Sequence, residues 1–285
     1  MLRYLRHAVP DGFTTNLVRY PISTLLYIPL IVVVVRRQSL GTFWKAALLP
    51  AVVNIIGQTL FAVSLYHMAA GMMSFLVRIS VVWSILGAFL LFPDERRLAR
   101  LPRFWLGAVL AVAGFVLMAF IGQDAAEVSD LGKLIVFLCS IFWGLYDITV
   151  RWTMRDLHPL VVFGVIGNYT SIGLILMAPL GEPASVLRLS AGDATLLVVS
   201  AFVGIAAAHG MYYVAIQRLG VAVSAITLLF TPFVSTVGEW MYLDEGMTPL
   251  QWAGGVILVL GAVTALLARQ KVARPSAPPM ETSLD

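Results

Sequence analysis

The sequence predicts an all-α integral membrane protein made of two related halves, and three observations point to this fold class. Hydrophobic residues make up 60% of the chain and charged residues 12%, with a mean hydropathy of +0.90, whereas soluble domains carry about 25% charged residues. Apolar runs of roughly 20 residues, the length that spans a bilayer as a helix, follow one another with short connections. Finally, several motifs recur in order at an offset of about 150 residues.

Nine apolar runs account for most of the chain. Each is predicted to be a helix, because a backbone in hydrocarbon must satisfy its own hydrogen bonds. The runs cover residues 14–36, 46–66, 73–92, 104–122, 132–152, 159–180, 194–217, 221–243 and 250–268. The remaining residues 270–285 are rich in proline and are predicted to form a disordered cytoplasmic tail.

Charge placement predicts the topology. Basic residues follow the odd-numbered runs, as at Arg36, Arg96, Arg151 and Arg269, and acidic residues such as Asp124 lie in the intervening loops. By the positive-inside rule the odd-numbered runs, and the C-terminus, end in the cytoplasm. The net charge of +4 is therefore a topology signal and predicts no nucleic-acid partner. We expect a multi-pass protein of a bacterial inner (plasma) membrane, with the lipid bilayer as its surroundings.

The internal repeat divides the chain into residues 1–123 and 124–269. The matching motifs are Asp94-Glu95 with Asp244-Glu245, Trp105-x-Gly107 and Gly114 with Trp252-x-Gly254 and Gly261, and Pro10…Arg19 with Pro159…Asn168. A period this long indicates a duplicated half-protein. The second half has one more helix, so we expect a parent of five plus five helices, of which four plus five are present here. A late start assignment, a truncation and a true nine-helix protein stay open.

An odd number of helices in each unit makes consecutive units enter the membrane from opposite sides. The two units are thus predicted to form an inverted repeat, related by an axis in the membrane plane. Secondary transporters are often built in this way, with the substrate site between the repeats.

At these residues the chain resembles the drug/metabolite transporter superfamily, specifically its ten-helix bacterial members with two EamA-type repeats. The features that carry the resemblance are Pro10…Arg19, Asp94-Glu95-Arg96, Pro232 and Asp244-Glu245. The resemblance implies a ten-helix inverted-repeat fold and the transport of small metabolites, often by export, with amino acids as common substrates. Two departures stand out: the first helix of the family is absent, and Val82 stands opposite Pro232.

Glu239 lies within the apolar run 221–243, where a charged side chain is unexpected. A charge at mid-bilayer costs roughly 2.5–3.5 kcal/mol, so an acid within a membrane span needs a reason. Ser235 lies on the same helix face as Glu239. Pro232 is predicted to kink this helix, because proline cannot donate a backbone hydrogen bond and so leaves a carbonyl free. Glu239 is interpreted as a contact to a substrate amine or as a proton-carrying carboxylate. The alternative is an acid that reaches the headgroup region.

Arg78 is predicted at a depth similar to that of Glu239, in the corresponding helix of the other repeat. Three roles are open: an ion pair with Glu239, a carboxylate-binding residue, or a side chain that snorkels to the surface. Asp147 is interpreted first as an ion-pair partner of Arg151 at i+4, and as a site residue second.

His209 is a candidate proton relay, or a donor to a neighbouring helix. Asn54 and Gln58 share one helix face, and Asn168 stands where Arg19 stands in the other half. Such amides bind substrates, or more often hold helices together.

Trp143 and Tyr212 are candidates for the wall of an aromatic-lined cavity, although aromatic residues also populate membrane interfaces. Gly107 and Gly114 form a close-packing face for helix contacts or for a homodimer.

The predicted function is a proton-coupled secondary transporter that exports a small polar metabolite, such as an amino acid, by alternating access. A facilitative carrier or importer of another metabolite, resembling nucleotide-sugar or drug carriers, is the alternative, and a channel or a membrane enzyme is less favoured. The four histidines are scattered and no phosphate-binding glycine loop occurs. No enzyme activity, metal or cofactor is therefore expected.

Overall fold

The computed structural model describes Leu5 and residues 8–35, 41–64, 67, 76–120, 130–231, 233–234, 237 and 248–273. Within these residues the chain is helical and contains no strand. In chain order, the helices are α2 (Gly12–Leu25), α3 (Ile28–Val35), α4 (Gly41–Ser64), η1 (Val77–Ile79), α6 (Ser80–Leu91), α7 (Pro93–Ala99), α8 (Pro102–Phe120), α9 (Asp130–Met154), α10 (Pro159–Leu176), η2 (Ala178–Leu180), η3 (Pro183–Arg188), α11 (Ala191–Ala201), the π-helix η4 (Phe202–Ala207), α12 (Ala208–Leu219), α13 (Val221–Leu228) and α15 (Pro249–Ala273).

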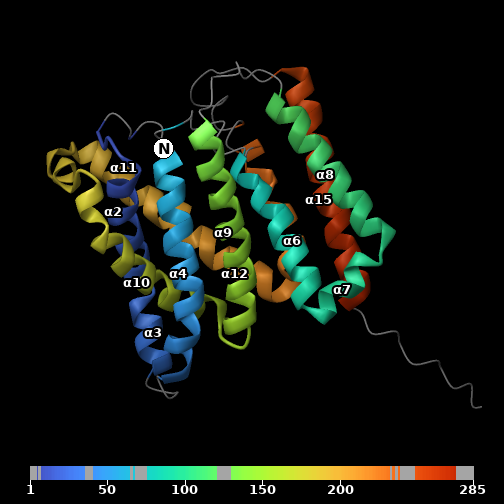
Figure 1. Ribbon diagram of the computed structural model, residues 1–285, viewed down its shortest axis with the longest axis horizontal. Coiled ribbons are helices and arrows are strands. Elements are labelled where there is room, and N and C mark those ends of the chain that lie inside the picture. Colours follow the sequence, from blue (N-terminus) through green and yellow to red (C-terminus); the bar gives the residue numbers. More distant parts are fainter. Residues whose placement is uncertain are drawn as a thin grey trace, which may run out of the picture.

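The long helices lie side by side in one bundle (Figure 1). At one edge α8 packs along α15, and at the other α10 packs against α2 and α4. Between them, α9 packs on both α4 and α6, so it joins the two edges. Helices from the first and second halves of the sequence are thus in contact throughout the bundle.

Five described helical segments are long and apolar enough to cross a membrane, namely Trp44–Ser64, Asp130–Met154, Pro159–Leu176, Ala191–Leu219 and Trp252–Arg269. Residues Val77–Leu91 add a sixth when they are counted with α7, across a bend of 116°. The other predicted runs are shorter as described helices. Run 14–36 is divided between α2 and α3, α8 is apolar over Pro102–Leu117, and most of run 221–243 beyond α13 lies outside the described residues.

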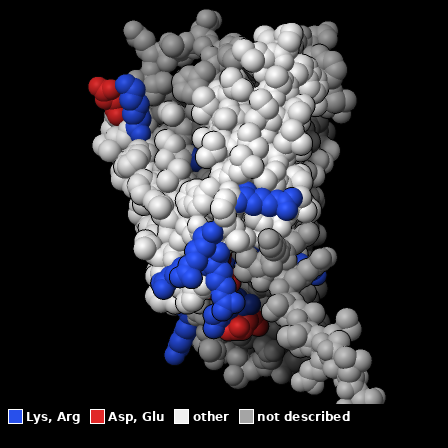
Figure 2. Space-filling view, turned by 90° about the vertical axis from the view of Figure 1, so that its right-hand side faces the viewer, with Lys and Arg blue, Asp and Glu red and all other residues white. Residues whose placement is uncertain are grey.

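The surface of the bundle is apolar and its interior contains polar residues, which is the reverse of a soluble protein. Large apolar side chains such as Leu90, Val109 and Leu176 are 70%, 63% and 76% exposed, whereas Asn54 and Asp147 are 1% and 6% exposed. Residues other than Lys, Arg, Asp and Glu cover most of the face shown in Figure 2. Most of the basic side chains on that face lie in its lower half, and one lies beside an acid near the upper left. A bilayer is the solvent that suits this surface. The predicted all-α membrane fold is confirmed.

The contact between α8 and α15 is made by backbone against backbone. A Cβ on Gly114 would lie 2.4 Å from the nitrogen of Leu258, and one on Gly107 would lie 2.5 Å from the nitrogen of Ala265. In return, a Cβ on Gly261 would lie 2.3 Å from the nitrogen of Ala111. Of the two predicted uses of these glycines, the structure has the helix contact within one chain. That face is therefore not open to a second copy.

A second junction joins α7, α9, α13 and α15 at the end of the bundle where the third, fifth and ninth predicted runs end. Glu95 in α7 is 0% exposed and accepts hydrogen bonds from the backbone nitrogens of Val221 (2.7 Å) and Ala222 (2.8 Å). The same carboxylate pairs with Arg151 of α9. Asp94 beside it pairs with Arg151 at 2.5 Å and with Arg269 at 3.5 Å.

Gly220 begins α13 at a position that only glycine fits. Its φ is +88°, and a Cβ there would lie 2.8 Å from both Nη1 of Arg151 and Oε1 of Glu95. Two acids and two arginines thus pair at this end of the bundle. Asp94 and Glu95 tether α7 to α9, α13 and α15. The side of the membrane on which this end lies stays a prediction.

Replacing Gly114 by alanine should separate α8 from α15, because the added methyl meets backbone on the facing helix. We expect the free energy of unfolding to fall by about 1–3 kcal/mol, as for other overpacked sites. Unfolding of the purified protein in mixed detergent and SDS micelles measures this change. Gly192→Ala is the matched control, since its nearest contact would be 3.8 Å. Equal stability of the two variants would contradict the close backbone contact.

Replacing Glu95 by glutamine should destabilise the protein far more than replacing Asp94 by asparagine. Glu95 is fully buried and its loss leaves Arg151 and two backbone N–H groups with fewer acceptors, which costs about 3–5 kcal/mol for a broken buried pair. The Asp94 side chain is 52% exposed, and we expect a loss of about 1 kcal/mol or less. The same unfolding assay compares them. A Glu95→Gln protein as stable as Asp94→Asn would remove Glu95 from this role.

Candidate functional site

Helix α2 turns its polar side chains toward the bundle. Its buried residues are all polar or aromatic with a hydroxyl, whereas Leu25 at its end is 60% exposed. Asp11 caps the helix by accepting from the nitrogen of Thr14 at 2.6 Å. Because water is absent from the apolar surroundings, these inward groups must find partners on neighbouring helices. They form the first part of the candidate site.

The predicted amide residues of α4 face α2 and α10. Gln58 accepts from Nδ2 of Asn16 at 3.3 Å, and Asn54 donates to Oγ1 of Thr170 at 3.0 Å. Both amides are buried. The hydroxyl of Tyr20 is buried in the same region, next to the amides of Asn54 and Gln58. This cluster joins α2, α4 and α10.

Asp147 lies at the centre of a second cluster, between α9, α6 and α12. Its Oδ2 accepts from Oγ of Ser84 at 2.6 Å and from the hydroxyl of Tyr212 at 2.9 Å. Arg78 acts electrostatically on both Asp147 and Tyr212. The predicted pair of Asp147 with Arg151 is wrong, because Arg151 lies one turn nearer the helix end and binds the two carboxylates of α7 instead.

Arg78 lies in the 3-10 turn η1 that precedes α6, and its Nε is buried without a hydrogen-bond partner among the described residues. The predicted partner Glu239 lies outside the described residues, as do Ser235 and the kink residue Pro232. The proposed Arg78–Glu239 pair therefore stays a prediction. What the structure adds is the proximity of Arg78 to Asp147, which sequence spacing did not indicate.

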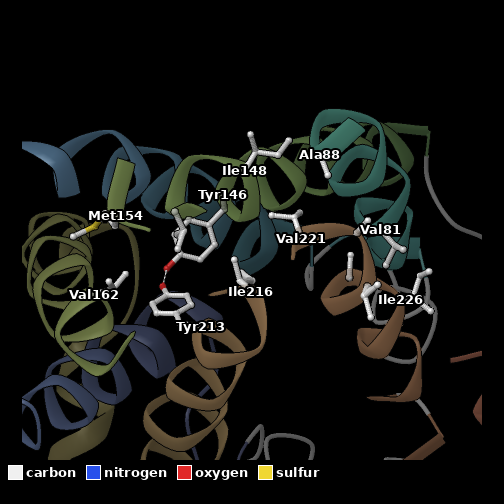
Figure 3. Close-up of a cluster of buried hydrophobic side chains, with 14 of the residues drawn as sticks. Val81, Ala88, Tyr146, Ile148, Met154, Val162, Tyr213, Ile216, Val221 and Ile226 are labelled. Carbon is white, nitrogen blue, oxygen red and sulfur yellow. Dashed lines mark hydrogen bonds between the residues drawn. The ribbon is translucent and has the colours of Figure 1, made fainter. Parts of the chain in front are cut away.

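Aromatic side chains lie between the two clusters. The hydroxyls of Tyr146 and Tyr213 point at each other and share a hydrogen bond (Figure 3). His209 stacks near Phe163 and Tyr213, with ring centroids 5.4 and 6.2 Å away, and its Nδ1 lies 3.0 Å from the carbonyl of Ile205. That carbonyl can only accept, so Nδ1 carries the proton. Tyr20 is 6.3 Å from His209, which links this group to the amides.

Two predicted site residues stand apart from this group. Trp143 stacks on Phe61 at 5.2 Å, fills the space over Gly57 and keeps a buried Nε1 without a partner in the described residues. Asn168 donates to the carbonyl of Gly164 in its own helix at 2.7 Å. It therefore bonds locally, although it stands at the repeat position of Arg19.

A feature that sequence reasoning missed is the π-helix η4 inside the seventh run. Three donors at spacing four bind carbonyls in and just before it. From α2, Arg19 binds Ser200 O at 3.0 Å and Ser23 binds Ala201 O at 2.8 Å, both at the end of α11. From the turn between α2 and α3, Tyr27 binds Ala206 O in η4 at 2.8 Å. A π turn loosens the regular hydrogen-bond ladder and occurs often at functional sites. The spacing of the donors was visible in the sequence, but nothing in the apolar run marked the π turn.

The groups that these clusters offer are a carboxylate, two guanidinium groups, amides and hydroxyls in an apolar bundle. Such a set can bind a small polar or charged molecule and can hold a proton on Asp147 or His209. Among the described residues, no group of three or more His, Cys, Asp or Glu side chains could hold a metal ion.

The known proteins that this chain resembles are named as transporters. The model of the EamA-like transporter family matches residues 130–267. The chain is 22% identical over 191 residues to an uncharacterized transporter of Haemophilus influenzae, covering 66% of this chain and 63% of that protein. It is 25% identical over 174 residues to the threonine/homoserine exporter RhtA of Escherichia coli K12, covering 59% and 54%. The matches thus span less than two thirds of the length of these relatives.

The fold also has a counterpart among solved structures. The crystal structure of a protein with 15% sequence identity superimposes with a TM-score of 0.71, covering 96% of this chain and 94% of the other. At that identity the likeness shows the fold alone. Residues 130–267 of this helical membrane protein thus match the EamA-like transporter family of the drug/metabolite transporter superfamily.

Proposed function

We propose that the protein is a secondary active transporter that exports a small polar metabolite, such as an amino acid, in exchange for protons. The observation that carries this proposal is Asp147, a carboxylate that is 6% exposed in the middle of an apolar bundle. Its two hydroxyl donors come from α6 in the first half of the chain and α12 in the second. A movement of one half relative to the other would change the set of donors.

Exchange follows from the chemistry of a single carboxylate. Asp147 can be balanced by a proton or by the ammonium group of a substrate, and one carboxylate does not need both at once. Burial in an apolar medium costs an ionised carboxylate more than the attraction of Arg78 returns, so an empty and deprotonated Asp147 is disfavoured. Binding of one cation would thus favour release of the other, which is the requirement for coupled exchange.

Alternating access requires an end of the bundle that opens. The junction of Glu95 and Arg151 closes one end by linking α7 of the first half to α9 and α13 of the second. We propose that this end is cytoplasmic and that the junction separates when the site opens inward. The exporter activity of RhtA, which is named for threonine and homoserine, supports an amino acid as the cargo.

Replacing Asp147 by asparagine should abolish coupling, because the amide cannot carry a proton. In proteoliposomes with an imposed pH gradient, we expect the gradient-driven flux of L-threonine and L-homoserine to fall by about ten- to a hundredfold, the factor for a lost charged hydrogen bond. Asp130→Asn is the control, since Asp130 pairs with Lys133 at the exposed start of α9.

The outcomes separate the parts of the proposal. Wild-type flux that ignores the pH gradient would contradict proton coupling and favour a facilitative carrier. Wild-type flux that depends on the gradient and survives in Asp147→Asn would instead move the coupling role to another residue, with Glu239 and His209 as the next candidates. Absence of any flux of either amino acid would contradict this cargo.

Ser84 and Tyr212 should act as one unit, because both donate to Oδ2 of Asp147. We expect Ser84→Ala and Tyr212→Phe each to lower the free energy of unfolding by about 1–3 kcal/mol. Their effects should not add in the double variant, as is usual for residues that share a partner. Additive losses in a double-mutant cycle would show that the two hydroxyls do not share Asp147.

A further inference from the structure

Arg19 is a buried arginine without a matching acid. Its side chain lies in α2 and the residue is 7% exposed. Its Nη2 donates to one backbone carbonyl, that of Ser200, and its buried Nε has no hydrogen-bond partner in the part of the chain that the structure describes. No carboxylate among the described residues lies within ion-pair distance of it. By contrast, Arg151 pairs with two carboxylates.

Burying the guanidinium of Arg19 without a described acid beside it costs free energy that the fold must offset. A charge deep in an apolar medium is expensive and is usually paired with another charge or with polar groups. The second buried arginine of the site, Arg78, has Asp147 within electrostatic reach. The buried carboxylates of the described chain have other partners: Asp11 caps α2, Glu95 pairs with Arg151, and Asp147 accepts from two hydroxyls. Arg19 is therefore left without an ion-pair partner among the described residues.

Holding helices together does not explain why this residue is an arginine. Ser23 in α2 and Tyr27 in the turn after it already bind carbonyls in and just before η4 with neutral hydroxyls. A neutral donor at position 19 would complete that row without a desolvated charge. At the corresponding position of the other repeat, the neutral Asn168 bonds to its own helix.

The surroundings of Arg19 hold its guanidinium in place and leave part of it free to bind. Gly204 of η4 lies so close that a Cβ there would be 2.8 Å from Nη2. Arg19 also acts electrostatically on His209 and on the neighbouring Tyr20, whose buried hydroxyl lies next to the amides of Asn54 and Gln58. The Nε of Arg19 is a charged donor without a hydrogen bond among the described residues, and a charged N–H group is a donor that an oxyanion accepts from.

We propose that Arg19 binds the carboxylate of the transported substrate. This inference rests on the proposed function, in which Asp147 takes the ammonium group. The ring contacts of Tyr20, His209 and Tyr213, with Tyr146 hydrogen-bonded to the last of them, connect the two charged ends of the site. A zwitterion would then meet a positive and a negative residue at opposite ends, and Arg19 would select against analogues without a carboxylate.

The test measures binding without transport. Purified protein in detergent is heated with each of the common L-amino acids, with L-lactate, and with the amides of those amino acids, and the shift of the melting temperature gives the apparent affinity. We expect carboxylates to stabilise the wild-type protein at least about tenfold better than the matched amides, the factor for charge-assisted hydrogen bonds. Arg19→Gln should lose this preference, and Arg155→Gln, an exposed arginine, should keep it.

A second variant covers the case in which Arg19→Gln does not fold. Gly204→Ala leaves the arginine in place but puts a methyl group against Nη2, and the flexible end of the side chain can shift to make room. We expect this variant to fold and to bind carboxylates about tenfold more weakly, with binding of the amides unchanged.

Each result decides between the claims. A carboxylate preference that survives in Gly204→Ala or in folded Arg19→Gln overturns the role of Arg19, and so does a wild-type protein that no carboxylate stabilises. Amino acids that stabilise the wild-type protein equally well as acids and as amides overturn the role of Arg19 while the proposed function stands. Stabilisation by L-lactate alone, lost in Arg19→Gln, supports Arg19 and overturns the amino-acid cargo.

Discussion

Inside an apolar bundle there is no water to complete a missing hydrogen bond, so each inward polar group needs a partner from another helix. The arrangement of this protein follows from that constraint. The donors Arg19 and Ser23 of α2 are directed to carbonyls at the end of α11. The hydroxyls of α6 and α12 are directed to Asp147, and the backbone of α13 to Glu95. The buried side-chain atoms without a partner in the described interior lie on Arg19, Tyr20, Arg78, Trp143, Ser185, Ser224 and Arg269. Of these residues, Arg19, Tyr20 and Arg78 belong to the candidate site.

Much of the fold could be predicted from the sequence, because span length and charge placement are properties of single segments. The described parts of the apolar runs are mostly helical, and Asp94-Glu95, Arg151 and Arg269 meet at one end, as their placement after odd-numbered runs suggested. The glycines at spacing seven were predicted to pack closely, and α8 and α15 do so. The inverted relation of the halves stays a prediction.

The site was harder to predict, since its partners come from distant segments. Helical spacing placed Arg151 beside Asp147, but it could not show that the α7 carboxylates lie nearer. The hydroxyl partners of Asp147 lie 63 and 65 residues away in sequence. Arg19 was noted only as a repeat position, because the π turn that binds it has no sequence signal in an apolar run. Glu239, Ser235 and Pro232, on which the sequence argument relied most, lie outside the described residues.

The backbone contact between α8 and α15 also limits how the protein can move. These two helices come from different halves of the chain, and their glycines leave no side chain between them that could change rotamer or slide. This close contact resists separation, so a rocking motion of the two halves would pivot about the edge formed by α8 and α15. The largest displacement would then occur at the opposite edge, where α2, α4 and α10 surround the amides and Arg19. That edge of the protein should therefore deform most easily under an applied force.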